Sequence, residues 1–296
     1  MATQNGLPGV VCCQLPGHPL WRRMCPARPA ILPTYTYRYL EVSYRISFET
    51  LNLRVYDVPM LPRILHPKLS PGHNQLSEEA SHHLVRVLRA TEGDAVVLFN
   101  GQGQEARAVL SQAHPKESIC QAETPESVNR ESPARITVIQ ALCLGDKMDW
   151  VVQKACELGA SRLMPVRTSR SQLKLDADRA SKRQAHWQRI ANAAAAQCGR
   201  NQVMTVLPVT SFEAALSVVS TTAWLLDPFA NQSLSTAPLT QDITLAIGPE
   251  AGWSDEEEAL AKQAGFQGVR CGPRILRTET AAAAVLTAIA VRLGEF

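Results

Sequence analysis

Residues 243–293 read ITLAIGPEAGWSDEEEALAKQAGFQGVRCGPRILRTETAAAAVLTAIAVRL, and this stretch decides the fold. Its first residues, Ile243–Ile247, form a short apolar run of the kind found in buried strands. The run stops at Gly248-Pro249. A helix is predicted to begin after Ser254, because Ser254 followed three residues later by Glu257 is a capping box.

A second unit of the same kind follows directly. A short segment, Gly268–Arg270, leads into a loop at Cys271–Leu276, and an Ala-rich helix from Thr280 to Val291 comes after it. Each Gly-Pro loop stands after a strand and before a helix, so the two loops should face one another at the carboxyl edge of a parallel sheet. Open α/β folds bind their ligands at that edge.

Acidic residues crowd the first loop and the helix after it. Glu250 lies in the loop, and residues 255–258 read Asp-Glu-Glu-Glu. A helix N-terminus that binds phosphate should not be crowded by acids, so a ligand with a positive centre, such as the sulfonium of S-adenosylmethionine, is favoured. The helix acids can equally serve only to complement the helix dipole. The charges therefore limit the class of ligand but do not identify the ligand.

The composition is that of a globular protein with two domains. The chain has 296 residues, of which 45% are hydrophobic and 19% charged, enough for a sizeable core. It contains no apolar run of about 18 residues, and a net charge of +3 is too small to indicate nucleic acid by itself. The eight cysteines show no C-x-x-C pair and no metal-ligand spacing with histidine. We therefore expect no metal, no disulfides and a cytoplasmic protein, with Cys143, Cys156 and Cys198 buried as small hydrophobes.

Residues 1–59 differ in composition from the remainder. All five tyrosines lie at or before Tyr56, and no sustained apolar period is present. The stretch has neither the apolar core of a signal peptide nor the composition of a transit peptide. We interpret it as a non-native or disordered extension, with translation starting at Met60.

Residues 60–132 are predicted to form a small β domain that ends in a linker. Glu79–Leu88 is expected to be a short helix. Ala95–Phe99 and Glu105–Leu110 are expected to be two strands of a hairpin. Ser111–Pro133, rich in Ser, Pro, Glu and Gln, is predicted to be the irregular linker.

Residues 133–296 are predicted to form the second domain. Arg135–Leu142 and Arg162–Val166 are expected to be strands, with an amphipathic helix at Asp146–Leu158 between them. A longer helix, Asp178–Cys198, comes next. This β-α-β rhythm predicts a parallel sheet.

Two groups of basic residues are candidates for contact with nucleic acid. The small domain concentrates Arg and His between Arg63 and Arg89, among few acids, which suits a face that contacts phosphates. The helix at Asp178–Cys198 carries a basic stripe, and Arg200 and Asn201 follow in a polar loop. Either group can also be an ordinary solvated surface.

Five separated motifs resemble the RsmE family, the bacterial enzymes of the SPOUT superfamily that methylate N3 of a uridine in small-subunit ribosomal RNA. The motifs are KMDWVVQKACELG at 147–159, TSRS at 168–171, AAAAQCGRNQV at 193–203, IGPEAG at 247–252 and GPRILRTETA at 272–281. The segment EEASHHLVRVLRATEGDAVVLFNGQG also resembles the PUA-like RNA-binding domain of that family. The resemblance begins at Met60.

The resemblance implies an α/β SPOUT domain whose parallel sheet is tied in a deep trefoil knot, together with a PUA-like β-barrel. It implies S-adenosylmethionine as cofactor, and a homodimer that acts on small-subunit ribosomal RNA in the assembled subunit. The implied cofactor-binding residues are Ile247, Gly248, Pro249, Glu250, Gly252, Cys271, Gly272, Ile275, Leu276 and Thr280. The implied RNA-binding residues are Arg63, Arg86, Arg89, Arg170, Arg189, Arg200 and Asn201.

Two residues depart from the family pattern. Ala251 stands where a glycine is typical, which would cost on the order of 1 kcal/mol if the backbone there needs a positive φ. Ala196 stands where a glutamate is common, so no catalytic role is assigned to that position.

The chemistry points to Arg277 and Glu279. Uridine N3 becomes nucleophilic only as its proton leaves, so the reaction needs a base or a group that stabilises the anion. We expect Arg277 to orient the uridine or stabilise its anion, and Glu279 to position it or accept its proton. The alternative is an Arg–Glu pair that only pins the loop, while Glu250 is expected to brace its own loop.

Two other functions stay open. One is a ribose 2′-O RNA methyltransferase of the same superfamily, against which the sequence LRTETA at 276–281 argues, because an Asn- and Ser-rich sequence would be expected there. The other is a non-catalytic RNA-binding factor in ribosome assembly, for which intact cofactor loops would be unnecessary.

Overall fold

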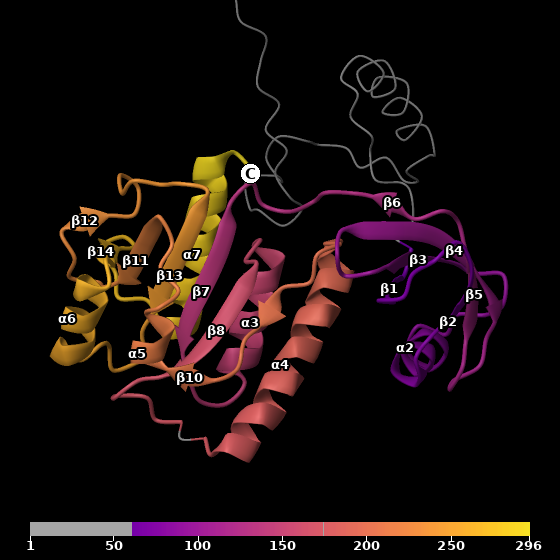
Figure 1. The fold of residues 1–296 in the computed structure, drawn as a ribbon, viewed down its shortest axis with the longest axis horizontal. Coiled ribbons are helices and arrows are strands. Elements are labelled where there is room, and N and C mark those ends of the chain that lie inside the picture. The colour runs from indigo at the N-terminus through magenta and orange to yellow at the C-terminus, as the bar shows by residue number, and fades with distance from the viewer. Residues whose placement is uncertain (1–60, 174) are drawn as a thin grey trace, which may run out of the picture. The chain divides into compact units, whose positions relative to one another are not determined.

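The structure is a computed structural model that describes residues 61–173 and 175–296 (Figure 1). Our interpretation of residues 1–59 lies outside the described residues. Met60–Phe296 form one compact unit, and its described strands fall into a six-stranded and an eight-stranded sheet. None of the helices in the described part of the chain is long and apolar enough to cross a membrane.

The six-stranded sheet builds the small N-terminal domain. Its strands are ordered β1-β3-β4-β5-β2, with β6 paired to β4. Their inward side chains, among them Leu98, Leu110 and Cys120, are fully buried. The strands are β1 (Arg63–Leu65), β2 (Gly72–Gln75), β3 (Ala95–Phe99), β4 (Gln104–Gln112), β5 (Ile119–Ala122) and β6 (Glu126–Ser127).

The helix expected at Glu79–Leu88 is present, but its form changes along its length. It starts as α2 (Glu78–His82) and continues as a π-helix, η2 (His83–Val87). Arg89 follows with a φ of 57°, the one positive value at a non-glycine residue in the described ranges.

The prediction that Ser111–Pro133 is irregular was wrong where parts of three strands fall within it. Strand β4 runs on to Gln112, and β5 and β6 both pair with it. Strand β5 alternates buried Cys120 and Ala122 with more exposed neighbours. Four residues are too few for that alternation to stand out in a Ser- and Pro-rich sequence.

The eight-stranded sheet is parallel at every described pairing, as the β-α-β rhythm predicted. Its order is β10-β8-β7-β13-β11-β14-β12, with β9 paired to β8. The central strand is the apolar run that opened the quoted stretch. The strands are β7 (Arg135–Ala141), β8 (Arg162–Arg167), β9 (Thr205–Val206), β10 (Thr210–Ser211), β11 (Thr222–Leu226), β12 (Gln232–Ser233), β13 (Asp242–Ile247) and β14 (Gln267–Arg270).

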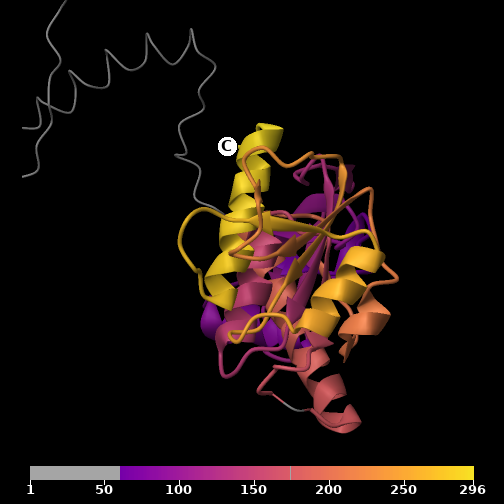
Figure 2. The same ribbon diagram turned by 90° about the vertical axis from the view of Figure 1, so that its left-hand side faces the viewer.

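Helices cover both faces of this sheet (Figures 1 and 2). One core joins the sheet to α3 (Lys147–Glu157), α4 (Ala177–Cys198) and α7 (Thr278–Leu293). A second core joins the other face to α5 (Phe212–Ala215) and α6 (Asp255–Gln263). Burial on both faces explains why β13 reads as a continuous apolar run.

The packing of α4 is mostly as expected. Trp187, Ala191 and Ala194 are buried, and the helix ends at Gly199 with a φ of 86°. Cys198 is exposed, however, so the prediction that it is buried was wrong. Cys143 and Cys156 are buried as predicted.

Buried ionic contacts join the small domain to the sheet domain. The Arg200 guanidinium donates to Glu131 and to the carbonyl oxygens of Cys156 and Ala160, the latter two at 2.7 and 2.9 Å. Asn201 donates to the Val128 carbonyl at 3.0 Å. These contacts fix the end of α4 against the segment that leaves the β domain.

A second set of contacts continues the junction. Arg63 donates to Glu105 at 2.7 Å and to the Asn201 side chain. Arg130 donates to both oxygens of Glu105, which lowers the pKa of that carboxyl to about 2.

The predicted RNA contacts of Arg200, Asn201 and Arg63 are corrected by this geometry. Arg200 and Asn201 are only 5% and 1% exposed, and the Arg63 side chain is 14% exposed. Their side chains bond mainly to partners inside the protein, so they hold the two domains together.

Replacing Arg200 should therefore destabilise the protein. We expect Arg200→Ala to lower the free energy of unfolding by about 3–5 kcal/mol, because Glu131 is left without its cation in a largely buried position. Chemical denaturation of the full chain measures this. The control is Arg135→Ala, whose ion pair with Asp242 is exposed and should matter little. Equal stability of the two variants would contradict the structural role.

Candidate functional site

The candidate site lies at the carboxyl edge of the parallel sheet. Strand β13 is flanked by β7 and β11, and β11 is flanked in turn by β14. Because these strands run in the same direction, the loops that follow them emerge together. We call the loop at residues 248–254 the first loop and that at 271–277 the second loop.

Gly248 is required by a close approach. A Cβ at this position would lie 3.1 Å from the Trp253 ring, which is tighter than ordinary packing. The indole is held in place, since it packs on Phe212 with ring centroids 4.4 Å apart. Its N–H donates to the Leu226 carbonyl at 3.2 Å. The first loop is thus fixed to the end of β11.

The departure at Ala251 has no conformational cost. The positive φ of this loop, 72°, falls on Gly252. The amide of Gly252 donates to the Pro249 carbonyl at 2.9 Å and closes the turn. An alanine at 251 fits the backbone as it stands.

The segment Thr168–Ser171 clamps the first loop from the side. Arg170 donates to the carbonyl oxygens of Ala251 and Trp253, at 3.3 and 2.6 Å. The Ser169 amide donates to Glu257 at 2.7 Å, and Glu257 also completes the predicted capping box with Ser254. In this structure Arg170 braces the loop that we expect to bind the cofactor.

Thr278 joins three segments. Its hydroxyl donates to the Gly248 carbonyl at 2.6 Å and accepts a hydrogen bond from the Gln140 amide at 2.9 Å. Thr278 is the first residue of α7, Gln140 lies in β7, and both are buried. One hydroxyl therefore ties the last helix to the first loop and to the neighbouring strand.

Charged groups meet beside this hydroxyl. Lys147 is the first residue of α3. Its side-chain nitrogen lies 2.6 Å from the nearest carboxylate oxygen of Glu250 and 3.9 Å from that of Glu279. Glu250 braces its loop, as expected. Glu279 Oε2 is buried and has no hydrogen-bond partner among the described residues.

Arg277 does not pair with Glu279. Its side chain is exposed and makes no hydrogen bond or ion pair within the described ranges. The structure thus does not contain the Arg–Glu pair that was the structural alternative. Arg277 is the exposed last residue of the second loop and the N-cap of α7.

The predicted cofactor residues gather at this edge. The second loop needs a glycine at Gly272, where φ is 80°. Burial raises the pKa of Cys271, so its thiol is not poised as a nucleophile. The first loop and its strand contribute Ile247, Gly248, Pro249, Glu250 and Gly252, the second loop contributes Cys271, Gly272, Ile275 and Leu276, and Thr280 lies in the first turn of α7.

The remaining basic candidates are exposed. Arg86 and Arg89 lie at the end of η2, and Arg189 lies on α4. The basic stripe on α4 includes His186, whose Nε2 lies 2.8 Å from the Asp149 carboxylate. Asp149 also accepts a hydrogen bond from the Trp187 N–H at 3.0 Å. No group of three or more His, Cys, Asp or Glu residues in the described chain could hold a metal ion.

Several site residues were missed by the sequence reasoning. Lys147, Gln140 and Trp253 each make a contact that fixes a loop, and the end of β11 at Leu226 joins the same edge. The predicted order of strand, loop and helix could have indicated Gln140 and Lys147. Gln140 lies near the carboxyl end of a parallel strand, and Lys147 begins the helix that follows it.

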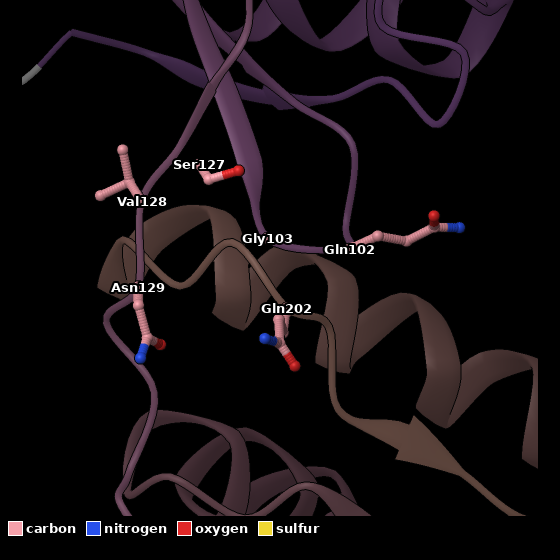
Figure 3. A pocket seen from close by; sticks show the side chains of 6 residues that line it. All are labelled: Gln102, Gly103, Ser127, Val128, Asn129 and Gln202. Atoms are coloured by element: carbon pink, nitrogen blue, oxygen red, sulfur yellow. The ribbon is translucent and has the colours of Figure 1, made fainter.

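Two surface hollows lie away from these loops. One, of about 250 Å³, is lined by Gln102, Gly103, Ser127, Val128, Asn129 and Gln202 (Figure 3). The other, of about 860 Å³, lies between α6 and the ends of β11 and β14. Neither is lined by residues of the first or second loop. Loop geometry therefore locates the site better than the hollows do.

The described chain matches two protein families. The RNA methyltransferase domain family matches residues 130–290, and the RNA methyltransferase PUA domain family matches residues 76–123. The fold and site together thus define an RNA methyltransferase with a PUA domain.

Curated relatives narrow the family. Ribosomal RNA small subunit methyltransferase E of Bacillus subtilis is 34% identical over an alignment of 228 residues that covers 72% of this chain and 88% of that protein. The protein of the same name from Synechocystis is 33% identical over 217 residues, covering 70% of this chain and 69% of that one. The chain belongs to the ribosomal RNA small subunit methyltransferase E family, RsmE, and the resemblance carried by the five motifs is confirmed.

Solved structures agree with this family. A putative methyltransferase from Legionella pneumophila, in complex with the cofactor SAM, is 35% identical with a TM-score of 0.75 and covers 78% of this chain and 98% of its own. The small subunit methyltransferase E of Neisseria gonorrhoeae, bound to S-adenosyl methionine, is 34% identical with a TM-score of 0.73 and the same coverage. The predicted α/β fold with a parallel sheet and a PUA-like domain is confirmed.

Removing the Thr278 hydroxyl should loosen the site and destabilise the fold. We expect Thr278→Val to lower the free energy of unfolding by about 1–3 kcal/mol, because the Gln140 amide and the Gly248 carbonyl each lose a buried partner. Urea unfolding of the full chain measures the change. The control, Thr287→Val, alters an exposed threonine of the same helix and should cost less than about 0.5 kcal/mol. Equal effects would show that the hydroxyl is not the tie we describe.

Proposed function

We propose that the chain methylates N3 of a uridine in small-subunit ribosomal RNA, with S-adenosylmethionine as methyl donor. The observation that carries this proposal is that the Thr278 hydroxyl ties the start of α7, and with it Glu279, to the first loop and to β7. Membership of the RsmE family supports it. So do the two relatives whose structures contain the cofactor.

The residues present fit this cofactor. The first and second loops offer mainly backbone and small side chains, among them Gly248, Gly252 and Gly272. Lys147, Glu250 and Glu279 together carry a net charge of −1, which suits a sulfonium and disfavours a phosphate. When bound, the cofactor supplies the electrophilic methyl group.

Glu279 is the proposed proton acceptor. Its Oε2 is buried and accepts no hydrogen bond within the described chain, although Lys147 lies 3.9 Å away, so a lone pair is available to accept the N3 proton of the uridine. The N3–H bond breaks as the O–H bond forms on Glu279. Once this proton has left, the N3 electron pair would be available to accept the methyl group that the bound cofactor would supply.

Arg277 is the proposed partner of the uridine itself. Its exposed guanidinium lies two positions from Glu279 and at the start of α7. From there it can donate to the uracil carbonyl oxygens that carry the negative charge once N3 is deprotonated. The two residues then share one substrate without pairing with each other.

We further propose that the C-terminal segment forms the trefoil knot of the superfamily. Strand β14 lies beyond β11, yet α7 packs on α3 and bonds to Gly248 and Gln140 on the other side of the first loop. The second loop, which connects β14 to α7, must therefore cross the other loops at this edge of the sheet. That crossing is what a knotted topology requires.

A homodimer is also proposed. Large apolar side chains are exposed on the second loop, on α7, on α3 and just after β7, where a second copy could cover them. They are Leu144, Trp150, Ile275 and Val291.

The RNA-binding assignment rests on residues 60–132 and on α4. Arg86, Arg89 and Arg189 are the exposed basic candidates that the structure leaves. The substrate would be the small subunit after its assembly, and the location the cytoplasm. Residues 133–296 would be the catalytic domain.

The ribose 2′-O alternative finds no support in the site. Its substrate hydroxyl would still need a base, but the residues before α7 remain LRTET with no Asn- and Ser-rich sequence. A non-catalytic RNA-binding factor would need neither the bracing of the first loop by Arg170 nor a buried Glu279 oxygen that accepts no hydrogen bond. Both features support the enzyme.

The test is nucleoside mass spectrometry of small-subunit RNA from cells with and without the gene. We expect 3-methyluridine to disappear with the gene and to return with a wild-type copy. Loss of a 2′-O-methyl nucleoside instead would replace the proposed chemistry, and no change at all would favour the binding-only role.

Variants of the two catalytic candidates sharpen this test. Glu279→Gln and Arg277→Ala should each lower turnover by about 10²-fold or more, because one loses the base and the other the stabilising cation. Labelled methyl incorporation measures the rate. Arg162→Ala, at the opposite edge of the sheet, is the control. Near-wild-type turnover of Glu279→Gln and Arg277→Ala would remove the catalytic assignment.

A further inference from the structure

A cation to which the sequence analysis gave no role lies between the first loop and the proposed base. Lys147 is the first residue of α3, the helix that packs against α7. Its nitrogen lies 2.6 Å from Glu250 Oε1 and 3.9 Å from Glu279 Oε2. Three segments that are distant in sequence thus present one ammonium and two carboxylates to each other.

The two carboxylates are unequally satisfied. Glu250 accepts a full hydrogen bond from Lys147, whereas Glu279 Oε2 is buried with no hydrogen-bond partner in the described chain. An ammonium has three donors, so Lys147 has donors left. Since N–H···O bonds are about 2.9 Å long, a shift of roughly 1 Å would let the same nitrogen bond both carboxylates.

Lys147 is also the main cation of the cluster. The charged and titratable groups that face Glu279 from its packed neighbours are Lys147 on α3, Glu250 in the first loop and Cys143 after β7. Burial, with the two glutamates, raises the pKa of Cys143 to about 12, so this thiol stays neutral. The positive charge that balances the glutamates therefore comes from Lys147.

The effect of Lys147 on its closer partner has a clear sign. Burial alone would raise the pKa of Glu250, but the hydrogen bond from Lys147 lowers it, and the pKa ends below its ordinary value. In turn Glu250 raises the pKa of Lys147. The ammonium and the carboxylate therefore keep each other charged near neutral pH.

We propose that Lys147 is a positioning residue of the methyl transfer. Its ammonium, which lies 2.6 Å from Glu250 and 3.9 Å from Glu279, bridges the two carboxylates, fixes the first loop against the start of α7, and holds Glu279 in position to receive the N3 proton. This inference rests on the proposed function, since it acts through Glu279. Lys147 is the first residue of the motif at 147–159, but no role was assigned to it there.

The test compares Lys147→Met with Lys147→Arg in the full chain, with small-subunit particles and labelled cofactor. For Lys147→Met we expect kcat to fall by about tenfold or more, while KM for the cofactor changes by less than about threefold. The acid limb of the kcat profile should move to higher pH, because two facing carboxylates without a cation retain a proton to higher pH. Lys147→Arg should restore both.

The control is Lys154→Met on the same helix. Lys154 also pairs with a glutamate at 2.7 Å and has a similar exposure, 30% against 34%, but it lies far from the loops. It should leave kcat and the pH profile unchanged. Thermal melting of every variant separates a folding defect from a catalytic one, and Lys147→Gln replaces Lys147→Met if the latter does not fold.

Three results would overturn the inference. They are a wild-type kcat in Lys147→Met, a lower kcat with an unmoved pH profile, and no recovery in Lys147→Arg. Glu279→Gln, assayed alongside, keeps the two proposals apart. If Glu279→Gln is inactive and Lys147→Met is normal, only the role of Lys147 fails. If Glu279→Gln is fully active, the proposed base itself is wrong.

Discussion

The hydroxyl of Thr278 is the interaction on which the site depends. It donates a hydrogen bond to the Gly248 carbonyl at 2.6 Å and accepts one from the Gln140 amide at 2.9 Å. Thr278 and Gln140 are both buried, so the contact between them is not readily exchanged for water. Everything proposed for the chemistry, from the placement of Glu279 to the reach of Lys147, follows from how this contact places the first turn of α7.

Local signals allowed much of the fold to be predicted. The capping box at Ser254 and the apolar runs of β7, β8 and β13 act within a few residues, and the structure contains each of them. Strand β5 was missed because four residues surrounded by Ser, Pro and Glu carry too little alternation to be read.

The site was less predictable, because its contacts are long-range. Lys147 meets Glu250 across 103 positions, and Gln140 meets Thr278 across 138. A single sequence holds no pattern that links such pairs. Arg200 shows the reverse error: its loop and charge favoured an RNA contact, but its partners bury it, and burial is a property of the folded chain.

The ionic junction between the domains constrains how such proteins can be recombined. Arg63, Glu105 and Arg130 belong to the segments of the small domain, yet their partners include Asn201 and the Gly199 carbonyl after α4. A chimera that took its small domain from a relative would leave buried charges without their counterparts. Such a chimera would be stable only if all the ionic residues of the junction were transferred together. The two domains therefore cannot be exchanged between relatives without these residues.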